Sequence, residues 1–133
     1  MTAVGRSEQQ LPILVIEDEP SVLSFVKTAL ERNGYRVETA ASGVDALKML
    51  ETGAFLGIVS DMRTPGGVDG SDVHDWVAAN RPELIPRLIF ITGDIVNEET
   101  AATLKRTGAP CVEKPFRIQQ LITVVEKLFG KPR

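Results

Sequence analysis

Residues 13–20 read ILVIEDEP, in which four apolar residues run directly into three acidic residues and a proline. A short run rich in Ile and Val, bounded by turn-forming residues, is typical of a buried strand in a parallel sheet. Comparable runs recur along the chain, and we expect strands at 12–16, 35–39, 55–60, 87–91 and 110–112. Segments with helical spacing separate these runs, and this alternation predicts βαβ units around one parallel sheet.

The residues that flank the intervening segments mark the expected helix ends. Pro20 fits the first turn of a helix that stops at Asn33-Gly34, and Ser42 with Asp45 forms a capping pair for the next helix. Three further helices are expected, over about 71–80, 98–107 and 118–129. The helix at 98–107 has only three apolar anchors, Ala101, Ala102 and Leu104, so we expect it to be held weakly.

Five strands and five helices in alternation predict an α/β fold, a three-layer α/β/α sandwich. We expect the five-stranded parallel sheet to take the flavodoxin-like order 2-1-3-4-5, the commonest arrangement for five strands. The chain has 133 residues, which allows one domain. That domain is predicted to cover residues 11–129, between a flexible N-terminal tail at 1–10 and a C-terminal tail at 130–133.

Composition excludes several classes of function. The 15 basic residues are scattered and are outnumbered by 18 acidic residues, which argues against direct nucleic-acid binding. The single cysteine, Cys111, and single histidine, His74, provide no zinc cluster, and the lone thiol fits a reducing cytoplasmic location. His74 is expected to be solvated or to cap a helix. No apolar run approaches the ~20 residues of a membrane span, so no membrane association is expected.

Functional side chains of such a fold are expected where its parallel strands end. Five polar residues follow or close predicted strands: Glu17, Asp18, Asp61, Thr92 and Lys114. Three carboxylates at one sheet edge repel one another unless a cation is present, and an all-oxygen set favours a hard ion such as magnesium, Mg²⁺. Lys114 and Thr92 suit phosphate oxygens, and an aspartate between metal and lysine suits phosphoryl transfer. Strands often end in polar residues, but five complementary groups at four strand ends favour a shared site.

Four segments in this order resemble the receiver domains of two-component response regulators. They are residues 13–20 (ILVIEDEP), 60–70 (SDMRTPGGVDG), 90–93 (FITG) and 114–116 (KPF). The resemblance extends over about residues 11–128. The run at 109–114 and the Gly66-Gly67 pair resemble, in addition, receivers attached to hybrid sensor kinases.

The resemblance implies that Asp61 accepts a phosphoryl group from a histidine kinase or a histidine phosphotransfer protein. Mg²⁺ is then held by Glu17, Asp18, Asp61 and the backbone carbonyl of Arg63, with Asp18 as a direct ligand. Thr92 and Lys114 bind the phosphoryl oxygens, and the Lys114-Pro115 peptide bond is expected to be cis. Such a chain is a switch and not an enzyme, apart from magnesium-dependent self-phosphorylation and dephosphorylation.

The chain also departs from the family pattern. Glu17 stands where the family usually has aspartate, and the Gly66-Gly67 pair lengthens the loop after Asp61. Cys111 replaces an aromatic residue that swings inward in many receivers, so the output must use other side chains and its partner is undefined. Arg63 and Asp94 flank the site and are expected to modulate it, as an ion pair or as two solvated charges.

Three other functions compete with the phosphorylated switch. A phosphatase of the haloacid dehalogenase type needs a general acid two residues after the nucleophile, where this chain has Arg63. A flavin-nucleotide binder needs a phosphate loop after the first strand, where residues 17–19 are all acidic. The main alternative is a receiver-like protein-binding module that is never phosphorylated.

Overall fold

The computed structural model describes residues 11–132, so the expected N-terminal tail lies outside the described residues. Its core is one sheet of parallel strands in the order β2-β1-β3-β4-β5, which confirms the predicted topology. The strands are β1 (Ile13–Ile16), β2 (Val37–Ala40), β3 (Gly57–Asp61), β4 (Leu88–Thr92) and β5 (Cys111–Glu113). Each begins one or two residues after its predicted start, because the ladder forms later than the apolar run begins.

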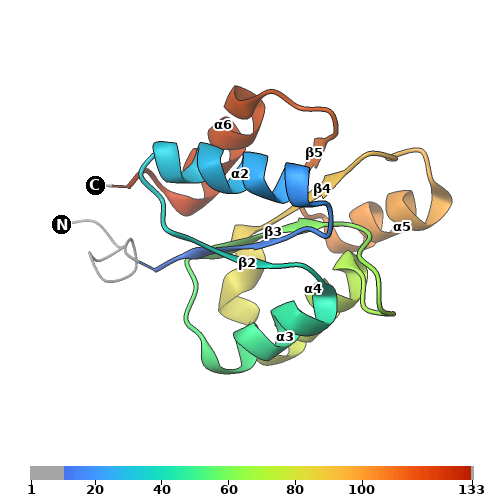
Figure 1. Cartoon of the computed structure of the whole chain (residues 1–133). Coiled ribbons are helices and arrows are strands. Elements are labelled where there is room, and N and C mark those ends of the chain that lie inside the picture. The colour runs from blue at the N-terminus through green and yellow to red at the C-terminus, as the bar shows by residue number, and fades with distance from the viewer. Residues whose placement is uncertain (1–10, 133) are drawn as a thin grey trace.

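Helices cover both faces of the sheet, which confirms the three-layer architecture (Figure 1). They are α2 (Pro20–Arg32), α3 (Gly43–Thr52), α4 (Gly70–Asn80), α5 (Glu98–Thr107) and α6 (Ile118–Phe129). The helices α2 and α6 lie on one face, and α3 and α4 lie on the other (Figure 1). A short 3₁₀ helix, η1 (Pro82–Arg87), was not predicted. None of the helices described between residues 11 and 132 has the length and apolar character to cross a membrane.

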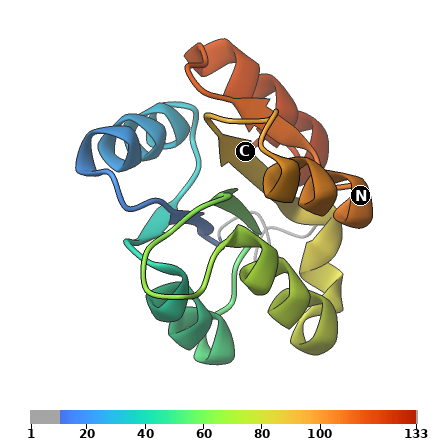
Figure 2. The ribbon, with the colours of Figure 1, turned by 90° about the vertical axis from the view of Figure 1, so that its right-hand side faces the viewer.

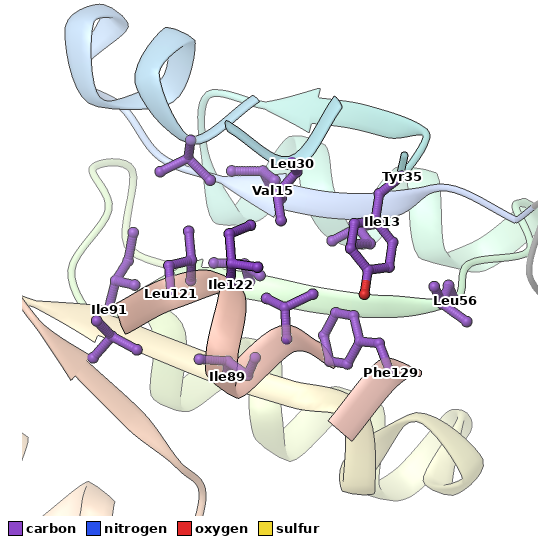
Figure 3. Packing of buried hydrophobic residues seen from close by; sticks show 14 residues of the cluster. Ile13, Val15, Leu30, Tyr35, Leu56, Ile89, Ile91, Leu121, Ile122 and Phe129 are labelled. Atoms are coloured by element: carbon purple, nitrogen blue, oxygen red, sulfur yellow. The ribbon is translucent and has the colours of Figure 1, made fainter. Parts of the chain in front are cut away.

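Two apolar clusters join the helices to the sheet, one on each of its faces. The first lies under α2 and α6, where Val15, Ile89, Leu121 and Phe129 point toward one another (Figure 3). The second lies under α3 and α4. Ile118 begins α6 at the surface, where it is 41% exposed. After α6 the chain lies beside the residues that follow α2: the hydroxyl of Tyr35 donates a hydrogen bond to the Gly130 carbonyl, and Pro132 lies next to Gly34.

Side chains cap the N-termini of α3 and α4, and the sequence predicted the first of these caps. The Ser42 hydroxyl accepts a hydrogen bond from the Asp45 backbone N–H at 3.1 Å, as the capping pair predicts. Asp69 and Asp72 form a reciprocal capping box at α4, which therefore begins one residue before its predicted start. A Cβ on Gly70 would lie 2.8 Å from the Asp61 carbonyl oxygen. The start of α4 is thus pressed against the end of β3.

The helix α5 has few apolar contacts, but they differ from those expected. Ala101 and Ala102 are exposed, Leu104 is half-buried, and the only buried residue of the helix is Thr100. On the surface, the Arg106 guanidinium binds Asp75 at 2.9 Å and the Ser71 hydroxyl at 2.8 Å, which ties α5 to α4. Because exposed ion pairs contribute at most about 1 kcal/mol, α5 remains an element with weak anchorage.

His74 is buried, which contradicts the expected solvated or capping role. Its ring stacks on Phe90 with centroids 6.1 Å apart and an interplanar angle of 30°. His74 lies next to Val73 on the side of α4 that packs on β4. The spacing of apolar residues along the helix did not predict that position 74 is buried. Burial lowers the pKa of His74, the charge of Asp75 opposes this shift, and the charge of Arg106 adds to it.

We expect this buried imidazole to make the fold sensitive to mild acid. The pKa of His74 is lowered in the folded state, so on acidification the unfolded chain binds a proton at a higher pH than the folded chain does. The free energy of unfolding therefore decreases as the pH is lowered below about 6.5. His74→Phe keeps a flat ring against Phe90 but removes this contribution. Urea unfolding at a pH of about 7.5 and about 5.5 measures the effect. An equal loss of stability in both proteins would contradict it.

Candidate functional site

The predicted functional residues meet at the carboxyl edge of the sheet, the edge that faces the viewer in Figure 2. Glu17 and Asp18 follow β1, Asp61 ends β3, Thr92 ends β4 and Lys114 follows β5. The hydrogen-bond ladder continues past the strand ends. Met62 N–H donates to the Ile91 carbonyl at 2.9 Å, and Lys114 N–H donates to the Thr92 carbonyl at 2.7 Å. The backbone therefore fixes the positions from which these side chains project.

An ammonium group bridges two of the carboxylates. Lys114 Nζ lies 2.7 Å from Glu17 Oε1 and 3.2 Å from Asp61 Oδ2. The Glu17 side chain is fully buried, and the side chains of Asp61 and Lys114 are 11% and 22% exposed. Paired charges at this depth attract more strongly than a surface pair.

The electrostatic setting keeps Lys114 protonated. Burial by itself lowers the pKa of its ammonium group. The hydrogen bond to Glu17 and the charges of Asp61 and Glu17 more than offset this effect, so the pKa of Lys114 lies above its usual value. Lys114 is thus a permanent cationic donor beside Asp61 at neutral pH.

Three carboxylates are placed for cation binding. One oxygen each from Glu17, Asp18 and Asp61 lie within 4.8 Å of one another, and the side chain of Asp18 is exposed. Carboxylate oxygens without imidazole or thiolate neighbours suit Mg²⁺, which binds through one or two carboxylates and keeps several waters. The donor set at this edge of the sheet therefore fits magnesium.

Further hydrogen bonds orient Asp61 and Thr92. Arg63 N–H donates to Asp61 Oδ1 at 3.3 Å, and the Ser60 hydroxyl donates to the Asp61 carbonyl at 2.9 Å. Ser60 was not predicted as a site residue, because a serine within a strand carries no distinctive sequence signal. The Thr92 hydroxyl is buried and accepts a hydrogen bond from Asp94 N–H at 3.2 Å. Thr92 thus links the end of β4 to the loop before α5.

The sequence left two possibilities open for Arg63 and Asp94, an ion pair or two solvated charges, and the ion pair between them is not formed. Asp94 Oδ1 instead accepts a hydrogen bond from Asn97 N–H at 3.1 Å, within the turn before α5. The Arg63 guanidinium lies 3.8 Å from Glu99 Oε2, on the first turn of α5. Glu99 was missed because its proximity to Arg63 depends on how the loop turns, and the sequence pattern does not define that turn.

Two further features concern β5 and the loop after it. The Lys114-Pro115 peptide bond is cis, as predicted. Cys111 is half-buried, and burial together with the charge of Glu113 raises the pKa of its thiol to about 11. A thiol with this pKa is protonated at neutral pH and is a poor nucleophile.

The sequence model of the response regulator receiver domain family matches residues 13–126. The chain belongs to this family. Among curated relatives, the receiver domain is 30% identical over 116 residues to the nitrogen assimilation regulatory protein NtrX of Azorhizobium caulinodans, covering 86% of this chain and 25% of that protein. It is 30% identical over 121 residues to the response regulator MprA of Mycobacterium ulcerans, covering 91% and 51%. The chain thus spans between a quarter and a half of these relatives.

Solved receiver domains have the same fold. The receiver domain of NtrX from Brucella abortus is 32% identical with a TM-score of 0.78, covering 88% of this chain and 97% of that one. The receiver domain of the sensor histidine kinase PA1611 from Pseudomonas aeruginosa has a TM-score of 0.80 at 24% identity, covering 91% and 98%. That second structure holds a magnesium ion in its active-site cleft.

Proposed function

We propose that this receiver domain is a phosphoryl-accepting switch and that Asp61 takes the phosphoryl group from a phosphohistidine of a histidine kinase or a histidine phosphotransfer protein. The observation that carries the proposal is the Lys114 ammonium group, which lies within 3.2 Å of both Glu17 and Asp61 and next to a three-carboxylate cluster. The unit proposed to carry this function is residues 11–129, between tails at 1–10 and 130–133. Its lone cysteine supports a cytoplasmic location.

The proposed transfer exchanges one phosphorus bond for another. A carboxylate oxygen of Asp61 forms the new bond to phosphorus while the bond from phosphorus to the donor histidine nitrogen breaks, and that nitrogen keeps the electron pair. We assign Glu17, Asp18, Asp61 and the backbone carbonyl of Arg63 to Mg²⁺, with Asp18 as a direct ligand. Bound magnesium supplies charge neutralisation for phosphoryl oxygens. The Lys114 ammonium group contributes a second positive charge beside Asp61.

The phosphoryl group is proposed to act on the loop between β4 and α5. Lys114 and Thr92 provide donors to its oxygens, and charge-assisted hydrogen bonds contribute about 1.5–3 kcal/mol each. Shifting the populations of two conformations from 1:99 to 99:1 takes about 5.5 kcal/mol, so two or three new hydrogen bonds to the phosphoryl group suffice. Thr92 already holds Asp94 N–H at 3.2 Å, and α5 is weakly anchored. A shift of Thr92 therefore carries this loop with it.

Magnesium-dependent phosphorylation by a small donor tests the proposal. We expect the protein, incubated with acetyl phosphate and Mg²⁺, to gain the mass of one phosphoryl group in intact mass spectrometry. Chelation of the metal should prevent the gain, because the carboxylate cluster then repels the anionic donor. Absence of any gain with magnesium present would favour the alternative, a receiver that acts only as a protein-binding module.

A further inference from the structure

Two buried side-chain polar atoms have no hydrogen-bond partner within residues 11–132: the hydroxyl oxygen of Thr100 and Nδ1 of His74. Thr100 is 1% exposed, so solvent does not replace the missing partner while α5 occupies this position. Burial of a hydroxyl group without a hydrogen bond is unfavourable, because its bonds to water are lost and no others take their place. The hydroxyl group of the one buried residue of α5 therefore opposes the packing of this helix on the domain.

The side of α5 that faces the domain carries few apolar groups. Its buried and half-buried residues recur at helical spacing, and they are Thr100, Thr103, Leu104 and Thr107. The corresponding side of α6 carries four fully buried residues, which are Leu121, Ile122, Val125 and Phe129. Because the favourable free energy of packing scales with the apolar area that is buried, α5 gains much less than α6 from its contact with the domain.

Both ends of α5 are nevertheless capped. Asn97 Oδ1 accepts hydrogen bonds from the backbone N–H groups of Glu99 at 3.0 Å and Thr100 at 3.2 Å. At the other end, Gly108 has a left-handed φ of 65°, and its N–H donates to the Leu104 carbonyl at 2.9 Å. Such caps stabilise a helix independently of its tertiary contacts. We therefore expect α5 to separate from the domain more readily than it unfolds.

We infer that the Thr100 hydroxyl group promotes the release of α5: it destabilises the packed position of the helix, which transiently leaves the domain as an intact unit. In the released helix the hydroxyl group gains hydrogen bonds to water. In the proposed switch, this bias lowers the free energy that phosphorylated Asp61 must supply to move α5. The link to Asp61 rests on the proposed function, whereas the release of α5 in the unphosphorylated protein does not.

Amide hydrogen exchange of the unphosphorylated protein measures this release. Thr100→Val replaces the hydroxyl group with a methyl group of similar size, so we expect the amides of residues 101–107 to exchange at least about fivefold more slowly than in the wild-type protein. The factor should be the same at each of these positions, because an intact helix opens as one unit. Thr100→Ser keeps the hydroxyl group and should not slow exchange. Thr28→Val makes the same substitution at an exposed position of α2 and is the matched control.

Three results would count against the inference. Exchange in Thr100→Val that is as fast as in the wild-type protein, or faster, would overturn it, because the hydroxyl group would then have a stabilising partner. Slowing confined to residues 101 and 102 would show that the helix frays and does not move as a unit. After phosphorylation, the amide signals of residues 93–107 should move less in Thr100→Val than in the wild-type protein, and equal movement would refute the link to Asp61. Failure of the wild-type protein to become phosphorylated would instead refute the proposed function.

Discussion

Replacement of Asp61 with asparagine is expected to abolish phosphoryl uptake. The amide has nearly the shape of the carboxylate, and its single oxygen can accept one of the two hydrogen bonds that Asp61 receives, from Arg63 N–H at Oδ1 and from Lys114 Nζ at Oδ2. It lacks the anionic oxygen that forms the bond to phosphorus, so the chemistry is lost while the fold is kept. Intact mass spectrometry after incubation with acetyl phosphate and Mg²⁺ measures the loss directly.

Asp75→Asn is the matched control for this variant. Asp75 lies on α4 and forms an exposed ion pair with Arg106, so its amide changes the same chemical group outside the site. We expect the control to take up one phosphoryl group as the wild-type protein does. Uptake by Asp61→Asn at the wild-type level would show that another residue is the acceptor.

Lys114→Met is expected to separate phosphorylation from its conformational effect. The variant retains Asp61, but it loses the ammonium group that lies 3.2 Å from this carboxylate. Without one or two bonds of about 1.5–3 kcal/mol each, the remaining donor, Thr92, falls short of the roughly 5.5 kcal/mol that a full population shift requires. In NMR spectra, the amide signals of residues 93–107 should move on phosphorylation of the wild-type protein and stay close to their unphosphorylated positions in the variant.

Lys48→Met provides the control, because Lys48 is an exposed lysine on α3. It should show the wild-type changes on phosphorylation. If Lys114→Met shows the same changes at the same degree of phosphorylation, Lys114 does not transmit the signal. The proposed route through Thr92 and Lys114 would then be wrong.

The architecture was accessible from sequence because apolar runs and cap residues identify each element separately. The ILVI run ended at Ile16 as expected, and α5 and α6 occupy their predicted residues. Parallel strands share one carboxyl edge, so Glu17, Asp61 and Lys114 had to converge once the order was known. For this reason the sequence alone predicts the main residues of the candidate site.

The sequence did not predict contacts that depend on the path of a loop or on which side of a helix faces the sheet. The Arg63 guanidinium lies near Glu99 and not Asp94, because the turn before α5 draws the Asp94 carboxylate toward Asn97. His74 is buried on an otherwise mixed helix face, where its ring stacks on Phe90. The short helix η1 contains Pro82 and Pro86. Prolines occur in loops as well as in 3₁₀ turns, so the sequence alone did not predict this helix.

Location of the phosphoryl group tests the central claim most directly. Borohydride reduces an acyl phosphate on an aspartate side chain to an alcohol and leaves free carboxylates intact, so peptide mapping of the reduced protein identifies the phosphorylated position. Asp61 as the single reduced aspartate, with reduction dependent on Mg²⁺ during phosphorylation, is the predicted result. Reduction at a different aspartate, or phosphate found on His74 or a hydroxyl group, would contradict the account.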